Sequence, residues 1–237
     1  MSVEIPKVIR PLTRLVVLSA IIGGAVLVWF LLTKCFLERE GYHRVNPVTK
    51  LVSEKHESIR ASDDVILFGD SRVDQWCNLP FSATSKIGIG GATAAELAWG
   101  LDSVLEGKFS QIAYVQCGIN DLKYLGVMEG DFENSVKRCV GDIQKIAKRL
   151  KALGAESVVV IGIFPIGEIP IVRKPFWSDE IDAARLEVNK LLSEQSGEYE
   201  YIDCDDVLND ASCFRDELHL SPMGYERVNR VVRASRK

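Results

Sequence analysis

Ser71, Asp216 and His219 are the residue types that together perform nucleophilic catalysis, although they lie far apart along this chain. A serine hydroxyl is a weak nucleophile, so it needs a histidine as general base and a carboxylate that orients the histidine. Asp216 precedes His219 by three residues, a spacing that lets one turn bring the carboxylate to the imidazole. We therefore predict that Ser71 is a nucleophile and His219 its base.

Few histidines in this chain could serve as the general base. His43 and His56 both precede the first predicted strand, so His219 is the one histidine in the globular part of the sequence. Catalysis by a serine also requires donors for the oxyanion that forms on the attacked carbonyl. The candidate donors are the backbone N–H groups of Ser71 and Gly91 and the side-chain amide of Asn120.

The pattern around these residues alternates between strands and helices. Apolar runs predict strands over residues 65–69, 86–88, 112–117, 157–164 and 199–202. Helical spacing or capping residues predict helices after Thr93, over residues 132–150, after Ser178 and after Ser221. This alternation indicates an α/β protein with a parallel sheet covered on both faces, and loops at one edge of that sheet should gather the candidate residues.

Four short blocks, in this order, resemble those of the SGNH or GDSL-type hydrolase family, in the branch of platelet-activating-factor acetylhydrolases and lysophospholipases. They are Gly69-Asp70-Ser71, Gly91 in a glycine-rich turn, Gly118-x-Asn120-Asp121 and Asp216-x-x-His219. The resemblance covers about residues 63–237. It implies a flavodoxin-like three-layer α/β/α fold with a five-stranded parallel sheet, and ester hydrolysis through an acyl-serine.

One departure from the family pattern is Arg72, where many members have an apolar residue. A guanidinium beside the serine could contact a carboxylate, phosphate or sugar of the substrate, or it could be a solvated surface group. Trp76 could form a wall of the substrate cleft, although a core indole is the commoner role. Asp70 and Asp121 are expected to hold their loops by hydrogen bonds rather than to do chemistry.

The N-terminal part of the chain is of a different kind. Residues 15–33 carry no charge, and a helix of this length nearly spans the hydrocarbon core of a bilayer. We expect a tail over residues 1–14, an uncleaved membrane anchor over 15–33 and a juxtamembrane linker over 34–62. A cleaved signal peptide, a lipoprotein cleavage box ending at Cys35 and a buried soluble helix fit the residues less well.

The charged residues on the two sides of this anchor give only weak information about its orientation in the membrane. Basic residues precede the helix at Lys7, Arg10 and Arg14, and others follow it from Lys34 onward, so the charge bias hardly distinguishes the two sides. A short tail before a single helix is the layout of a signal anchor. We therefore expect the C-terminal domain to lie outside the cytoplasm.

The composition and the motifs indicate which classes of partner and cofactor are not expected. The net charge is −4 and the basic residues are scattered among acids, so nucleic acid is not an expected partner. No metal-binding spacing and no cofactor motif is present, and Gly88-x-Gly90-Gly91 lacks the third glycine of a dinucleotide fingerprint. The six cysteines suggest no disulfide framework, although Cys204 and Cys213 could pair across a loop in an oxidising compartment.

The function expected from these residues is a serine esterase that acts on a small acyl ester, such as an O-acetyl group on an envelope glycan, or on a lipid ester. An acyltransferase could use the same acyl-serine, because the acceptor decides between transfer and hydrolysis. A non-catalytic carbohydrate-binding module on the same fold is the other alternative, and the intact Ser71, Asp216 and His219 argue against it. The oligomeric state is left open.

Overall fold

The computed structural model describes residues 9–45, 64–105, 112–126, 131–195 and 197–236, and side chains from 15–35, 64–101, 112–126, 131–195 and 197–236. The contacts divide the chain into two units, one containing the N-terminal helix and the other the sheet with the remaining helices. Each unit is described by itself.

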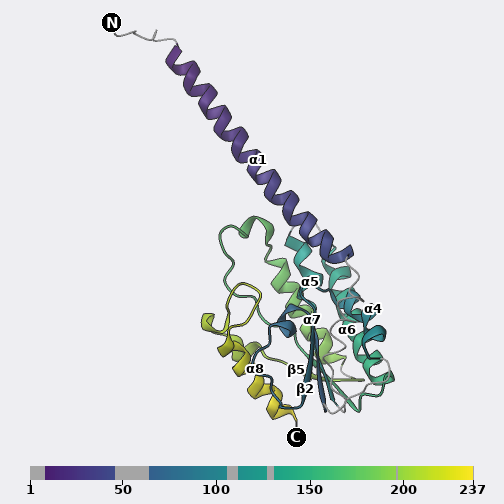
Figure 1. The fold of residues 1–237 in the computed structure, drawn as a ribbon. Coiled ribbons are helices and arrows are strands. Elements are labelled where there is room, and N and C mark those ends of the chain that lie inside the picture. The colour runs from purple at the N-terminus through teal and green to yellow at the C-terminus, as the bar shows by residue number, and fades with distance from the viewer. Residues whose placement is uncertain (1–8, 46–63, 106–111, 127–130, 196, 237) are drawn as a thin grey trace. The chain divides into compact units, whose positions relative to one another are not determined.

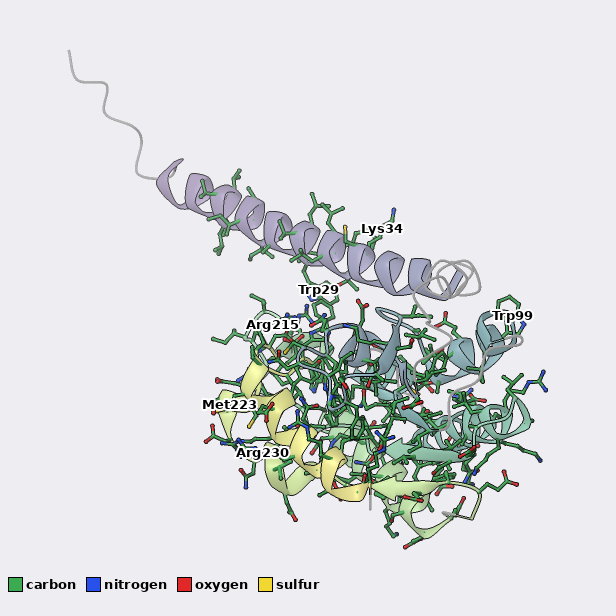
Figure 2. All side chains as sticks on the ribbon, turned by 60° about the horizontal axis from the view of Figure 1, so that its bottom comes forward. Trp29, Lys34, Trp99, Arg215, Met223 and Arg230 are labelled. Atoms are coloured by element: carbon green, nitrogen blue, oxygen red, sulfur yellow. The ribbon has the colours of Figure 1, made fainter. Side chains whose placement is uncertain are left out.

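The N-terminal unit is the single helix α1 (Ile9–Val45). Its stretch Leu15–Cys35 is long and apolar enough to cross a membrane, and its side chains, Trp29 and Lys34 among them, extend from the helix unburied (Figure 2). This helix is a candidate anchor or signal sequence.

The helix α1 extends beyond the predicted anchor of residues 15–33 into the predicted linker. A glycine such as Gly41 weakens a helix but does not have to end it. The helix α1 ends at Val45, two residues before Pro47, and a proline disfavours helical backbone at the residue before it. The rest of the predicted linker, residues 46–62, lies outside the described part.

The second unit is built on a five-stranded parallel sheet, as predicted, with strand order β2-β1-β3-β4-β5. This is the flavodoxin-like order. The strands are β1 (Val65–Gly69), β2 (Thr84–Gly88), β3 (Ile112–Gln116), β4 (Ser157–Ile161) and β5 (Glu200–Ile202). In register, Gly69 at the end of β1 lies between Gly88 of β2 and Gln116 of β3.

Helices cover both faces of this sheet, which makes the three layers that the sequence predicts. One face carries α4 (Ala94–Leu105), α6 (Phe132–Ala152) and α7 (Glu180–Glu194), and the other carries α3 (Ser71–Asp74) and α8 (Pro222–Ser235), as Figure 1 shows. Shorter helices lie in the connections: α5 (Ile119–Leu122), η1 (Lys123–Gly126), η2 (Lys174–Phe176), η3 (Asp205–Leu208) and η4 (Ala211–Cys213).

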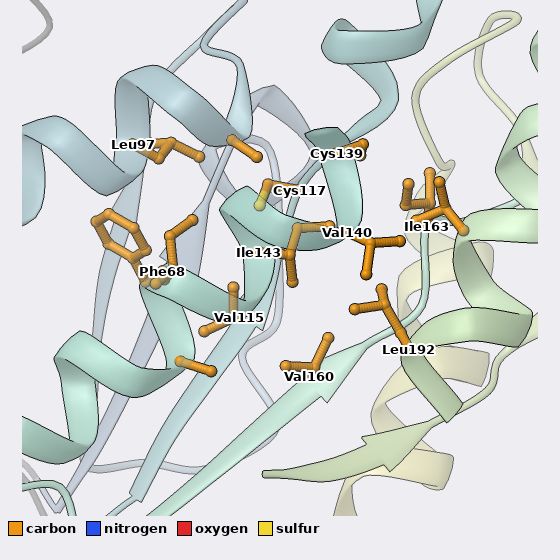
Figure 3. Packing of buried hydrophobic residues seen from close by; sticks show 14 of the residues in the cluster. Phe68, Leu97, Val115, Cys117, Cys139, Val140, Ile143, Val160, Ile163 and Leu192 are labelled. Carbon is orange, nitrogen blue, oxygen red and sulfur yellow. The ribbon is translucent and has the colours of Figure 1, made fainter. Parts of the chain in front are cut away.

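The core on the α4, α6 and α7 face consists of strand residues that interlock with one side of each helix. Its members in Figure 3 include Phe68, Leu97, Val115, Val140, Ile143, Val160 and Leu192. Burial of such side chains contributes about 1.5–3 kcal/mol each, so this layer holds the strand ends, and the loops that follow them, in fixed positions.

Two of the predicted helix caps are present in the structure. The Thr93 N–H donates to the Glu96 carboxylate at 2.8 Å, and the Glu96 N–H donates back to the Thr93 hydroxyl at 3.3 Å, which completes the capping box of α4. Ser221 caps α8 through a hydrogen bond from the Gly224 N–H, with Pro222 in the first turn.

The fourth strand is shorter than predicted, because a side chain takes over the hydrogen bonding. The run of residues 157–164 is buried from Val158 onward, but β4 stops at Ile161. The Asn189 side chain then accepts from the Ile163 N–H at 2.8 Å and donates to the Ile163 carbonyl at 3.0 Å. An amide that satisfies both backbone groups replaces a neighbouring strand.

Cys204 and Cys213 are both buried thiols in this structure, and they do not pair. The Cys213 thiol lies 3.8 Å from the Val207 carbonyl. The suggested pairing of these two cysteines is therefore not made.

Candidate functional site

The candidate residues meet at the carboxyl edge of the sheet. Ser71 follows the end of β1, and the strands on either side of β1 end in the loops that contain Gly91 and Asn120. The segment before α8 contributes Asp216 and His219. Parallel strands place such loops along one edge, so the order of strands brings four separate parts of the sequence together.

Ser71, His219 and Asp216 form a continuous hydrogen-bonded chain. The Ser71 Oγ lies 3.1 Å from His219 Nε2, and His219 Nδ1 lies 2.9 and 3.0 Å from the two carboxylate oxygens of Asp216. With the proton on Nδ1, the imidazole donates to Asp216 and its Nε2 accepts from the serine hydroxyl. This is the arrangement that a general base for Ser71 requires.

The Asp216 carboxylate is held in its charged form. Burial acts to raise its pKa, but hydrogen bonds from the backbone N–H groups of Leu218 and His219, and from the His219 ring, outweigh burial and lower the pKa to about 2. Asp216 is therefore ionised at neutral pH, and it can stabilise an imidazolium.

Asp70 holds the turn that presents the serine. It is the N-cap of α3, and its carboxylate accepts from the Arg72 N–H at 2.8 Å. The residue is fully buried, and burial raises the pKa of its carboxyl, against the opposing effect of the Arg72 charge and N–H. This position supports the expectation that Asp70 fixes the loop.

On the other side of Ser71, two loops are joined by side chains of the Asn120-Asp121 pair. The Asn120 Nδ2 donates to the Ala92 carbonyl at 2.9 Å, and the Asp121 carboxylate accepts from the Ala94 N–H at 2.8 Å. An amide nitrogen has two hydrogens, so the bond to Ala92 orients the Asn120 amide and leaves one N–H for a ligand. Gly91 itself has φ of 77°, a backbone conformation that favours glycine.

The Asp121 carboxyl differs sharply from that of Asp216. Its pKa is raised to about 7, chiefly by burial and also by the charges of Asp142 and Asp70, while the Ala94 N–H acts in the opposite direction. Much of the Asp121 population is therefore neutral near pH 7. Its hydrogen bond to Ala94 agrees with the expectation that it holds a loop.

Arg72 and Trp76 are not at the surface of the site, which corrects their suggested contact with substrate. Both are buried, with exposed fractions of 0% for Arg72 and 1% for Trp76. Trp76 packs against Phe164 and Tyr225 and donates its indole N–H to Asn229. Arg72 is not a solvated surface group either, because its guanidinium is bonded to backbone carbonyls.

Two arginines that the sequence analysis did not select contact Asp216 or the residue that follows it, Glu217. Arg215 contacts Asp216 at 3.2 Å and Gln75 at 2.7 Å, and its side chain is exposed. Arg173, in the loop after β4, forms an ion pair with the buried Glu217. In the sequence, Arg215 and Glu217 are the neighbours of Asp216, and this was the one sign that they could lie near the site. Being next to each other in the sequence does not show which side chains make contact.

In the parts of the chain that the structure describes, no group of three or more His, Cys, Asp or Glu side chains is arranged to hold a metal ion. The polar groups around Ser71 include the His219 ring and, in the neighbouring loops, the hydrogen-bonded Asn120 amide.

Comparison with known proteins gives a family and a set of structures. Residues 67–227 match the model of the GDSL-like lipase/acylhydrolase family. The comparison with curated proteins gave no match.

Three solved structures illustrate the fold similarity. A Streptococcus pneumonia protein described as a platelet activating factor is 17% identical, with a TM-score of 0.69 over 86% of this chain and 98% of that chain. A GDSL-like lipase from Bacteroides thetaiotaomicron is 14% identical, with a TM-score of 0.61 over 79% and 96%. A catalytic mutant of Axe2, an acetylxylan esterase from Geobacillus stearothermophilus, is 16% identical, with a TM-score of 0.54 over 74% and 94%.

Proposed function

Because the chain belongs to the GDSL-like lipase/acylhydrolase family, we propose that it is a serine esterase that cleaves a small acyl ester through an acyl-serine intermediate. The observation that carries the proposal is the hydrogen-bonded chain from Ser71 Oγ through His219 to Asp216, with a serine-to-imidazole distance of 3.1 Å. This distance lies within hydrogen-bond reach of a general base.

In the first half of the reaction, Ser71 Oγ forms a bond to the carbonyl carbon of the ester while its proton passes to His219 Nε2. The carbonyl oxygen becomes an oxyanion, and the proposed donors to it are the N–H groups of Ser71 and Gly91 and the free N–H of Asn120. When the tetrahedral intermediate collapses, the bond to the alcohol breaks and His219 gives its proton to the departing alkoxide. The acyl group is then on Ser71.

In the second half, water attacks the acyl-serine and gives a proton to His219 Nε2. Collapse of the second tetrahedral intermediate releases the carboxylic acid and returns the proton to Ser71. Asp216 keeps Nδ1 of His219 protonated and stabilises the imidazolium in both halves, which its low pKa of about 2 allows at neutral pH.

The proposed substrate is an O-acyl ester with a short acyl group, such as an acetyl ester of an envelope glycan, and a lipid ester is next. Two observations support this class: an acetylxylan esterase shares the fold, and the N-terminal apolar helix is a candidate membrane anchor. A chain-length series of p-nitrophenyl esters tests it. The highest kcat/KM is expected for the acetyl or propionyl ester, and a preference for long acyl chains would contradict the proposal.

The nucleophile is tested by labelling with a serine-reactive fluorophosphonate. The wild-type chain should be labelled at Ser71, whereas Ser71→Ala should lose both labelling and esterase activity while keeping its circular dichroism spectrum. Ser193→Ala changes an exposed serine on α7 and should behave as wild type. Labelling at another residue in an active preparation would refute the assignment.

The proposed location is the membrane, with α1 as a single anchor and the catalytic domain outside the cytoplasm. The apolar stretch Leu15–Cys35 supports the membrane location. Protease added to intact cells with a permeabilised outer layer should release a soluble domain cut within residues 41–62. Complete protection until the cells are lysed would place the domain in the cytoplasm.

A further inference from the structure

Arg72, the residue that follows the candidate nucleophile, is fully buried and makes three hydrogen bonds through its guanidinium. Its Nε donates to the Leu218 carbonyl at 2.8 Å, and its two terminal nitrogens donate to the carbonyls of Phe164 at 2.9 Å and Pro165 at 3.2 Å. The planar group also lies over the Phe164 ring, 5.6 Å from its centre. None of these partners is a carboxylate.

These carbonyls belong to two different loops of the site. Phe164 and Pro165 lie in the connection after β4, and Leu218 directly precedes His219. The Arg72 side chain therefore joins the segment that carries the nucleophile to the segment that carries the base. The bond from Arg72 to Leu218 runs beside the bond from Ser71 to His219, one residue away on each segment.

The main chain of Arg72 is held as firmly as its side chain. The Arg72 N–H donates to Asp70 at 2.8 Å, and the Arg72 carbonyl accepts from the Tyr225 hydroxyl of α8 at 2.6 Å. Burial lowers the pKa of the guanidinium to about 10, and the neighbouring Asp70 charge acts in the opposite direction. Arg72 thus stays cationic at neutral pH, and charge-assisted bonds of this kind are shorter and stronger than neutral ones.

We propose that Arg72 is a positioning residue that sets the distance between Ser71 Oγ and His219 Nε2 by binding the loops on both sides of the site. This inference rests on the proposed function, since it assigns Ser71 and His219 as the reacting pair. It does not give Arg72 any contact with substrate, because no part of the residue is exposed.

The geometry explains why an arginine is needed at this place. A guanidinium is a rigid planar fork that can donate in three directions at once, whereas a lysine ammonium is a compact charge on a flexible stem. Lysine would keep the charge near Asp70, but it would not reproduce bonds to carbonyls on two loops. A displacement of about 1 Å between reacting groups can cost roughly 100-fold in rate, so loss of the fork should be visible in kcat.

A second buried arginine in the same domain provides a matched control. Arg185 on α7 has an exposed fraction of 4% and donates to the Ile163 carbonyl at 3.2 Å, next to the carbonyls that Arg72 binds. Its remaining partners are Asp182 and Asp205. Arg185 thus supports the same loop after β4, but within the described part of the chain its hydrogen bonds do not reach the His219 segment.

The experiment compares Arg72→Lys, Tyr225→Phe and Arg185→Lys in the full chain, with p-nitrophenyl acetate as substrate. For Arg72→Lys we expect kcat to fall about 10- to 100-fold with KM nearly unchanged, together with a similar fall in the rate of fluorophosphonate labelling. Tyr225→Phe removes only the hydroxyl that holds the Arg72 carbonyl, so a smaller fall in kcat is expected. Arg185→Lys should lower the melting temperature without lowering kcat of the folded enzyme.

A second measurement does not depend on esterase activity. The proton NMR signal of the His219 Nδ1–H, which is bonded to Asp216, should shift or broaden in Arg72→Lys and keep its position in Arg185→Lys. The inference is overturned if Arg72→Lys retains the kcat and this signal of the wild type, or if Arg185→Lys alters both equally. If instead Ser71→Ala remains active, the proposed function fails, and the NMR comparison still decides whether Arg72 positions His219.

Discussion

The two sides of the site around Ser71 hold a carboxyl group in opposite ways. On the side proposed to move the proton, hydrogen-bond donors outweigh burial and lower the pKa of Asp216 to about 2. On the side proposed to bind the oxyanion, burial dominates and raises the pKa of Asp121 to about 7. A carboxylate that must stabilise an imidazolium needs its charge, whereas one that holds a loop beside an oxyanion serves better when neutral.

The two sides also differ in the kind of group, side chain or backbone, that performs the proposed chemistry. The proton-transfer side consists of side chains, so Ser71, His219 and Asp216 are already in contact. The oxyanion side depends largely on backbone N–H groups, and their directions are set by loop conformation, by Gly91 with φ of 77° and by the bonds that Asn120 and Asp121 make across the loops. Loss of a group that reacts should therefore cost more than loss of one donor among several.

The largest effect is expected for His219→Ala. This change removes the general base, so kcat should fall by about 10⁴- to 10⁶-fold while the melting temperature changes little. Steady-state kinetics with p-nitrophenyl acetate measures it. The double variant Ser71→Ala/His219→Ala should be no slower than either single variant, because the two groups act as one unit; additive losses would contradict the proposed mechanism.

The next largest effect is expected for Asp216→Asn. The amide would favour the wrong tautomer of His219, with a loss in kcat of about 10⁴-fold. Asp205→Asn changes an aspartate that pairs with Arg185 outside the triad, and it should affect stability rather than kcat. Similar kcat losses in both variants would show that Asp216 has no special role.

A smaller effect should come from Asn120→Ala on the oxyanion side. One donor is lost from an oxyanion that has others, so kcat should fall about 10²- to 10³-fold, equivalent to roughly 3–4 kcal/mol, with KM nearly unchanged. Asn134→Ala removes an exposed amide on α6 and should leave kcat at the wild-type value. A rise in KM without a fall in kcat would make Asn120 a residue that binds the ground state.

Gly91→Ala and Gly90→Ala test the loop itself. Alanine at position 91 must adopt φ near 77°, which costs roughly 1–2 kcal/mol, so the melting temperature and kcat should both fall. An added Cβ at Gly90 meets no atom within 4 Å, and Gly90→Ala should be nearly neutral. Equal behaviour of the two variants would refute the role given to the conformation of Gly91.

The last effect is on stability and not on rate, and it is the pH dependence due to Asp121. Its pKa is about 7 in the folded chain against 3.8 for an ordinary aspartate. The folded state therefore binds more protons between these values, and the unfolding free energy should fall as pH rises from about 4 to about 7. Urea titrations across this range should show that Asp121→Asn removes this slope. An unchanged slope would contradict the raised pKa.

For Asp216, the unfolding free energy should change with pH in the opposite direction. Its folded pKa of about 2 lies below the ordinary value of 3.8, so its contribution to stability is present above about pH 4 and is lost as the pH falls towards 2. The contributions of Asp121 and Asp216 therefore fall in different pH ranges, and extending the urea titrations down to about pH 2 would compare them.

Much of the fold and of the candidate site follows from local patterns. Three features depend on residues that lie close together in the sequence. They are the end of the first strand at Gly69, the capping box of Thr93 and Glu96, and the helix start at Ser221-Pro222. The same is true of the bond between Asp216 and His219, three residues apart. Local chemistry of this kind can be read from residue types and spacing, which is why the alternation of strands and helices and the four blocks could be anticipated.

The tertiary structure alone decided which distant groups meet. Ser71 and His219 are 148 positions apart, and Arg72 and Leu218 are 146 apart, so both bonds exist only because the parallel sheet brings these loops to one edge. Arg72 could be interpreted from its type as a surface or substrate-binding cation, since a charged residue usually stays exposed. Its burial depends on three carbonyls supplied by two other loops, and no pattern near position 72 encodes that they converge there.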